Sequence, residues 1–240
     1  MHAFKGRAGV KEFLKKLGEL LLNLVYPRRA VCMGCGNPLG CDRDDLCEVC
    51  HAQLAQNWVG VRTPDRRLGL DGAAFAHAYF GPAGGMVRRL KYHGAWVLAE
   101  SMGADVARAA AMLRLKELRF VTAVPMHPRR LRLRGRNHAE LIARQVAARM
   151  GVPYAPLLMR TRNAPQQARL GGRTRRNNQK GGFALRPEWR DAVAGAEVLL
   201  IDDVFTTGAT AAGCAEPLRA AGARRVWLAA YAIGERSSHG

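Results

Sequence analysis

Apolar and polar positions along the chain predict strands and helices in alternation. Five short apolar runs predict strands, at residues 73–80, 120–124, 157–160, 198–201 and 225–233. Four segments predict helices, at residues 84–93, 95–113, 137–150 and 210–221, and the third of them has Asn137 as its N-cap and Gly151 as its stop. Strands that alternate with helices are typical of an α/β fold with a parallel sheet and helices on both faces.

The N-terminal segment has apolar residues at three- and four-residue steps, namely Val10, Phe13, Leu14, Leu17, Leu20, Leu21 and Leu24. This spacing predicts an amphipathic helix over residues 9–25 that ends at Pro27. Its apolar face would pack on the body of the protein, on a membrane surface or on another chain. Because Glu19 interrupts the apolar run, we do not expect a signal peptide, and no apolar run is long enough for a transmembrane segment.

The chain is strongly basic, since 38 Lys and Arg residues stand against 19 Asp and Glu residues and leave a net charge of +19. A positive field of this size attracts nucleic acid and nucleotide phosphates, although a solvated basic surface would have the same composition. The arginines cluster in two stretches that we expect to be loops. These are Arg129, Arg130, Arg132, Arg134 and Arg136, and then Arg169, Arg173, Arg175 and Arg176.

Four of the six cysteines form two C-x-x-C pairs, Cys32 with Cys35 and Cys47 with Cys50. This spacing predicts a small module around a structural Zn²⁺ with four thiolate ligands, in which no position is open for catalysis. Cys41 and His51 compete for a ligand position, and Cys214 is expected to be a buried free thiol. Metal-binding cysteines indicate a reducing compartment, so we expect the cytoplasm.

The segment from residue 198 to residue 210 contains the main candidate site. Asp202 and Asp203 follow a buried strand, and a turn rich in Thr and Gly then leads into a helix. Ligands of open α/β sheets bind at the carboxyl ends of the strands. Backbone N–H groups at Thr206, Thr207, Gly208, Ala209 and Thr210 would hold a phosphate at the start of the helix, while the two carboxylates would suit ribose hydroxyls and Mg²⁺.

These thirteen residues resemble the phosphoribosyl-pyrophosphate (PRPP) signature of type I phosphoribosyltransferases. The resemblance implies that Asp202 and Asp203 contact the ribose 2′- and 3′-hydroxyls and that residues 206–210 bind the 5-phosphate. Thr206 departs from the purine-salvage members, which tend to have an acid there, and it cannot accept a proton from a base. Arg129 and Arg130, after the strand at residues 120–124, are candidates for binding diphosphate, and residues 160–176 are a candidate lid.

The whole pattern resembles the ComF/GntX family of competence-associated proteins from Cys32 to Ile233. The resemblance rests on the two cysteine pairs, Leu90-Lys91-Tyr92-His93-Gly94, Arg134-Gly135-Arg136-Asn137, residues 167–177 before Gly182-Phe183, and the Asp-Asp-Val loop. Arg136 and His138 depart from the family pattern, in which Phe and Gln are more common. The resemblance to this family implies a type I phosphoribosyltransferase-like domain over residues 70–240. This domain would follow a helix at residues 1–30 and a four-cysteine zinc module at residues 31–60.

Three competing functions follow from the resemblance and from the residues themselves. The chain would bind ribose 5-phosphate or PRPP and take part in handling internalised DNA in natural competence, with single-stranded DNA held by the basic stretches. It would alternatively be an active PRPP-dependent transferase that joins ribose 5-phosphate to an unidentified base or nucleophile. It would otherwise be an adaptor for a helicase or a recombination mediator. The shortage of aromatic residues near the basic runs, where only Tyr92, Trp96 and Tyr154 lie, counts against DNA binding.

Overall fold

The structure is a computed structural model that describes residues 31–39, 45–64, 66–161 and 182–234. The expected N-terminal helix, Cys41, the second arginine stretch and nearly all of the expected lid lie outside the described residues. Within the described residues, no helix has the length and apolar content needed to cross a membrane.

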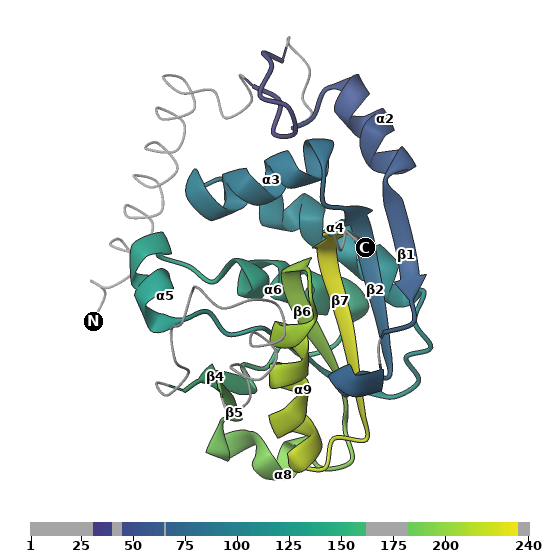
Figure 1. The fold of residues 1–240 in the computed structure, drawn as a ribbon, viewed down its shortest axis with the longest axis vertical. Coiled ribbons are helices and arrows are strands. Elements are labelled where there is room, and N and C mark those ends of the chain that lie inside the picture. Colours follow the sequence, from purple (N-terminus) through teal and green to yellow (C-terminus); the bar gives the residue numbers. More distant parts are fainter. Residues whose placement is uncertain (1–30, 40–44, 65, 162–181, 235–240) are drawn as a thin grey trace, which may run out of the picture.

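A five-stranded sheet forms the centre of the molecule, with the strand order β1-β2-β7-β6-β3 (Figure 1). The four parallel strands are β2 (Gly72–Ala78), β7 (Arg225–Ile233), β6 (Glu197–Phe205) and β3 (Leu118–Ala123). The edge strand β1 (Trp58–Arg62) is antiparallel to β2. The prediction of an α/β fold with a parallel sheet is therefore confirmed. The antiparallel strand β1 was not predicted, because a short edge strand with Gly60 in it gives little apolar signal.

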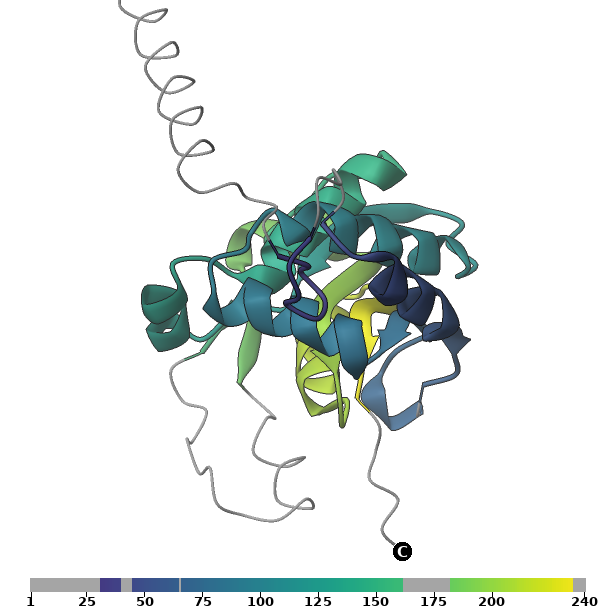
Figure 2. The ribbon, with the colours of Figure 1, turned by 90° about the horizontal axis from the view of Figure 1, so that it is seen from above.

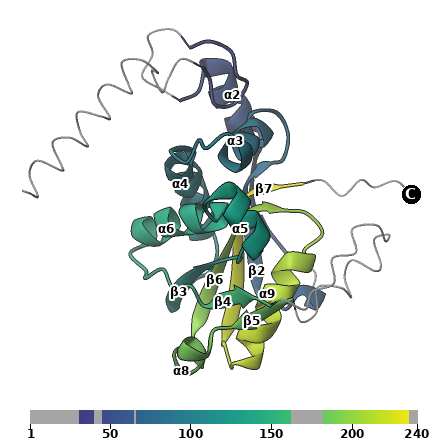
Figure 3. The ribbon, with the colours of Figure 1, turned by 90° about the vertical axis from the view of Figure 1, so that its left-hand side faces the viewer.

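Helices cover both faces of the sheet (Figure 3). The helices α3 (Gly81–Tyr92), α4 (Leu98–Ala111) and α6 (His138–Met150) lie on one face. The other face carries α9 (Ala209–Ala220), the hairpin of β4 (Leu158–Arg160) and β5 (Phe183–Leu185), and the short helices η1 (Arg66–Leu68), η2 (Pro187–Trp189) and α8 (Arg190–Val193). Because both faces are covered, residues 198–201 of β6 and 228–232 of β7 are wholly buried and read as continuous apolar runs.

Residues 128–134 form a short helix and not the loop expected from the sequence. This helix, α5 (Pro128–Arg134), starts with Pro128 at its first position, and His127 Nδ1 caps it by accepting a hydrogen bond from the backbone N–H of Arg129 at 3.1 Å. It ends at Gly135, whose φ of 72° few other residues adopt. The arginines carry no apolar periodicity, so only these capping signals identify the helix.

The cysteine module packs closely on the start of α3. Its helix α2 (Glu48–Gln56) begins directly after Cys47 and carries Cys50. A Cβ atom on Gly85 of α3 would lie 1.9 Å from the carbonyl oxygen of Gly34, so only glycine permits this approach. The buried His77 of β2 adds a polar link, since its ring nitrogens contact the carbonyl oxygen of Leu54 at 3.1 Å and Asp105 of α4 at 2.9 Å.

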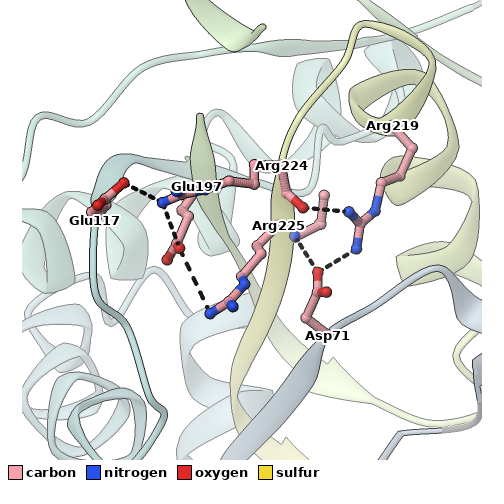
Figure 4. A network of polar contacts seen from close by, with 7 residues as sticks. Asp71, Glu117, Glu197, Arg219, Arg224 and Arg225 are labelled. Carbon is pink, nitrogen blue, oxygen red and sulfur yellow. Dashed lines mark hydrogen bonds and ion pairs between the residues drawn. The ribbon is translucent and has the colours of Figure 1, made fainter. Parts of the chain in front are cut away.

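A network of charged side chains joins the amino ends of the central strands (Figure 4). Glu197, the first residue of β6, is 1% exposed and accepts a hydrogen bond from Arg224 at 3.0 Å. Asp71 pairs with Arg219 of α9 and accepts a hydrogen bond from the backbone N–H of Val226 at 2.7 Å. These contacts hold the edge of the sheet that lies opposite the candidate site.

Candidate functional site at the carboxyl end of β6

The parallel strands end together at the edge of the sheet that faces α3 and the cysteine module (Figures 1 and 2). β6 lies inside the sheet between β7 and β3, and it runs further than the sequence predicted, to Phe205. Asp202 and Asp203 therefore belong to the strand itself and not to the following loop. Neighbouring side chains on a strand point to opposite faces, so the two carboxylates have different surroundings.

The loop between β6 and α9 is the candidate phosphate loop. Gly208 caps α9 with a φ of 77°, and a Cβ atom there would lie 2.7 Å from Leu68 Cδ1. Thr207 Oγ1 accepts a hydrogen bond from the backbone N–H of Ala209 at 3.5 Å, and the side chains of Thr206 and Thr207 are exposed. The first backbone N–H groups of a helix have no partner within the helix, and they carry the positive end of its dipole.

Asp203 forms an ion pair with α3. Its Oδ1 lies 2.7 Å from Nζ of Lys91, and both side chains are largely buried. His138, the first residue of α6, is 1% exposed nearby. Burial lowers the pKa of His138, and the charges of Arg134 and Lys91 lower it further while Asp203 opposes them. His138 is therefore neutral at pH 7.

Asp202 has a different environment on the side of α9. Its Oδ1 accepts a hydrogen bond from the backbone N–H of Asp203 at 2.9 Å. Burial, followed by the charge of Asp203, raises the pKa of Asp202 to about 8. Cys214 of α9 is buried and free, as predicted, and burial followed by the charge of Asp202 raises the pKa of this thiol. A protonated Asp202 at neutral pH means that a ligand must supply donors or a cation to ionise it.

The candidate diphosphate residues, Arg129 and Arg130, lie on α5 at the same edge of the sheet. Arg130 lines a groove together with Lys91, Arg134 and His138. Of these, Lys91 and His138 were not assigned a role from the sequence. Lys91 stands in a segment that carried the family resemblance, whereas His138 was noted only as a departure from the family pattern. The sequence placed Arg160 only in the candidate lid at residues 160–176. Burial lowers the pKa of Arg160, and its Nε has no hydrogen-bond partner among the described residues.

A second cavity, of about 470 Å³, adjoins Thr206. Its walls are mostly apolar and come from β1, β2, η1 and the ends of β6 and β7, with Val59, Leu68, Phe75, Phe205 and Ile233 among them. The rings of Phe75 and Phe205 lie 5.0 Å apart. The cavity therefore opens on the same loop as the candidate phosphate site.

The four predicted metal ligands lie together. Sulfur atoms of Cys32, Cys35, Cys47 and Cys50 all fall within 4.8 Å of one another, and Cys35 Sγ lies 3.9 Å from Cys47 Sγ. Four sulfurs at ~2.3 Å from one Zn²⁺ in a tetrahedron would stand roughly 3.8 Å apart, so the set fits zinc. Burial opposes ionisation of Cys32, but the backbone N–H groups of Cys35, Cys47 and Gly34 outweigh it and lower its pKa to about 6. A four-cysteine cluster consistent with structural zinc is thus confirmed.

Curated relatives align with about half of the chain or somewhat more. This chain is 30% identical to DNA utilization protein YhgH of Salmonella typhi over 135 residues. The aligned stretch covers 51% of this chain and 58% of that protein. It is 29% identical over 153 residues to Competence protein F of Haemophilus influenzae, which is 62% of this chain and 66% of that protein. The alignments therefore span less than two thirds of these relatives. No family model matches the chain.

Solved structures also show similarity. A glutamine PRPP amidotransferase from B. subtilis, complexed with ADP and GMP, matches with a TM-score of 0.41 at 18% identity, over 59% of this chain and 30% of that one. A protein from Thermus thermophilus matches with a TM-score of 0.36 at 17% identity, over 59% of this chain and 85% of that one. The relatives in sequence, together with the four-cysteine cluster, confirm the resemblance to the ComF family of competence-associated proteins.

Proposed function

We propose that the loop after β6 binds the 5-phosphate of a ribose phosphate such as PRPP, and that the protein acts in the handling of internalised DNA. The observation that carries the first part is the loop at the carboxyl end of a buried strand, where an acidic pair precedes a hydroxyl-rich helix start. The N–H groups of residues 208–210 and the hydroxyls of Thr206 and Thr207 supply donors for a phosphate. Asp202 and Asp203 supply acceptors for ribose hydroxyls.

The electrostatics of the acidic pair support a ligand that carries both hydroxyls and a cation. Two carboxylates at one site repel each other, and here Lys91 neutralises one while a proton neutralises the other. Hydroxyl donors from ribose would replace the proton on Asp202. Mg²⁺ would arrive with the diphosphate, since this ion prefers carboxylate oxygens together with substrate phosphates. Because the two side chains point to opposite faces, one carboxylate at most would hold the ion.

Two observations support the DNA-handling part of the proposal. The relatives are named for competence and DNA utilization. The net charge of +19 favours association with a polyanion. A reaction that joins ribose 5-phosphate to a nucleophile is the second candidate function, and the apolar cavity beside Thr206 favours it. In that reaction the nucleophile would bond to the ribose C1 while the C1–O bond breaks and diphosphate leaves.

Calorimetry with PRPP and Mg²⁺ at near-physiological salt tests the ribose-phosphate site. We expect saturable binding that is lost in Asp203→Asn and in Thr207→Val, because each removes one kind of ligand contact. Glu188→Gln is the matched control, since it removes an exposed acid that contacts Arg186 away from the site. Binding that equals the binding of tripolyphosphate, or that survives in both site variants, would contradict the proposal.

A further inference from the structure

A groove of about 460 Å³ separates the end of α3 from α5, on the same edge of the sheet as the candidate phosphate loop but beyond Lys91. Its lining combines aromatic, basic and apolar side chains and is made of Leu90, Lys91, Tyr92, Gly94, Trp96, Arg130, Leu133, Arg134 and His138. Figures 1 and 2 show α5 beside the C-terminal end of α3. The groove is thus built from two segments about forty residues apart that the fold brings together.

Two aromatic rings stand exposed at this groove. Tyr92 is 66% exposed and Trp96 is 42% exposed, and Trp96 is the only one of the four tryptophans with an exposed side chain. Each ring carries a guanidinium on one face. Arg134 lies 4.8 Å from the centre of the Tyr92 ring, and Arg136 lies 4.5 Å from the centre of the Trp96 ring. Aromatic rings and guanidinium planes are the surfaces on which unpaired bases stack.

The charge of the groove is positive and largely uncompensated. Among the described residues, no carboxylate lies within ion-pair distance of Arg130, Arg134 or Arg136. Some other described arginines do have acidic partners, as Arg144 has Glu140 and Arg224 has Glu197. Arginines without acidic partners next to exposed rings fit a ligand that brings phosphates and bases at once.

A buried group on the floor of the groove also lacks a partner. His138 Nδ1 is inaccessible to solvent and makes no hydrogen bond to any described residue. Leaving a buried ring nitrogen unpaired costs free energy, so the floor of the groove holds a polar group whose hydrogen bonding is incomplete. This observation is independent of the charges and rings above.

We propose that this groove binds single-stranded nucleic acid, with bases stacked at Tyr92 and Trp96 and phosphates held by Arg130, Arg134 and Arg136. A single strand is favoured over a duplex because its base faces and edges are free, whereas a duplex offers mainly phosphates. The inference rests on the DNA-handling part of the proposed function and not on its ribose-phosphate part. The sequence has few aromatic residues near its basic stretches, but two of them, Tyr92 and Trp96, line this one groove.

The test is fluorescence anisotropy with a labelled oligothymidine. Its length of roughly 15 nucleotides is near the upper limit of the site that one single-strand-binding fold covers. Trp96→Ala and Tyr92→Ala should each weaken binding by at least about fivefold, because stacking of each base is lost. Trp96→Phe should keep most of the affinity. The Arg136→Ala variant should lower the slope of log affinity against log salt by about 0.7.

Arg108→Ala is the matched control, because Arg108 also covers a tryptophan, Trp58 at 3.9 Å, but lies on α4 outside the groove. Binding equal to wild type is expected for it. Thermal unfolding of each variant checks that the fold is retained. PRPP titrated into Trp96→Ala separates the two proposals, since ribose-phosphate binding should survive there.

Three results would overturn the inference. One is wild-type affinity of both ring variants for the oligonucleotide. Another is equal loss in Arg108→Ala and Arg136→Ala, which would mean that only net charge matters. The last is displacement of the labelled oligothymidine by duplex DNA or by an acidic polypeptide at the same concentration at which an unlabelled single strand displaces it. That result would assign the surface to another class of partner.

Discussion

Asp202 and Asp203 are neighbours in the sequence, yet replacing each by asparagine should change the stability of the protein in opposite directions. Asp202 is half-buried and its pKa is raised from 3.8 to about 8, so the folded protein holds a proton that the unfolded chain releases near pH 4. This group therefore costs no stability below pH 4 and costs progressively more as the pH rises towards 8. Asp202→Asn removes that cost.

The size of the effect follows from the shift and from the exposure of the group. A full shift of about four units would correspond to roughly 6 kcal/mol at ~1.4 kcal/mol per unit, but partial solvent exposure reduces it to about 1–2 kcal/mol. Asp203→Asn instead breaks a largely buried ion pair with Lys91, at a cost of about 1–3 kcal/mol, between the exposed and buried cases. For a chain of this size each kcal/mol moves the Tm by about 2–4 °C.

Thermal unfolding between about pH 5 and pH 8 measures both effects. We expect the Tm of Asp202→Asn to exceed that of the wild type by an amount that grows with pH. We expect the Tm of Asp203→Asn to lie below the wild type throughout the range. A lower Tm for Asp202→Asn at pH 8, or a constant difference across the range, would refute the reasoning that this carboxyl is protonated in the folded state.

Other perturbations should have equally specific results. Gly85→Ala should destabilise the protein by about 1–3 kcal/mol in chemical denaturation, because its Cβ would meet the backbone of Gly34, while Gly84→Ala, whose Cβ meets only the end of Arg88 at 3.2 Å, should be neutral or up to ~1 kcal/mol stabilising. Equal effects of the two would contradict the packing of the cysteine module on α3. Cys47→Ser should lower the zinc content measured by metal analysis, and one zinc per chain in that variant would indicate Cys41 as a spare ligand. Affinity for PRPP should rise as the pH approaches 8 and level off above it, since the ligand needs ionised Asp202, and Asp202→Asn should flatten this dependence in calorimetry.

The sequence predicted the parts of the fold that have strong local signals. The buried strands appear as apolar runs, and the four-cysteine cluster appears as two C-x-x-C pairs whose spacing fits a tetrahedral ion. The first edge strand and α5 were missed because their signals lie in single capping and pairing residues. His127 identifies α5 only when its ring is seen to accept a hydrogen bond from the chain ahead of it.

The acidic pair and the candidate phosphate loop could be proposed from the sequence because all their residues lie on one segment. The partners of the pair were not, since Lys91 stands more than a hundred residues before Asp203 and only the packing of α3 on the sheet joins them. The same holds for the groove, where Tyr92 and Arg134 meet through tertiary structure. Sequence therefore predicted the chemistry of single segments, and the structure supplied the electrostatics between them.

Lys91 belongs to both proposed sites, because it pairs with Asp203 and lines the groove. Ribose hydroxyls that donate to Asp203 would weaken its hold on Lys91 and free the ammonium group for a phosphate in the groove. Linkage requires the converse, so a single strand that draws Lys91 away should change the affinity for ribose phosphate by the same factor. Calorimetric titration of PRPP with and without saturating oligothymidine measures this factor. Lys91→Met should bring it to one, and an unchanged factor in that variant would show that the two sites do not communicate through this side chain.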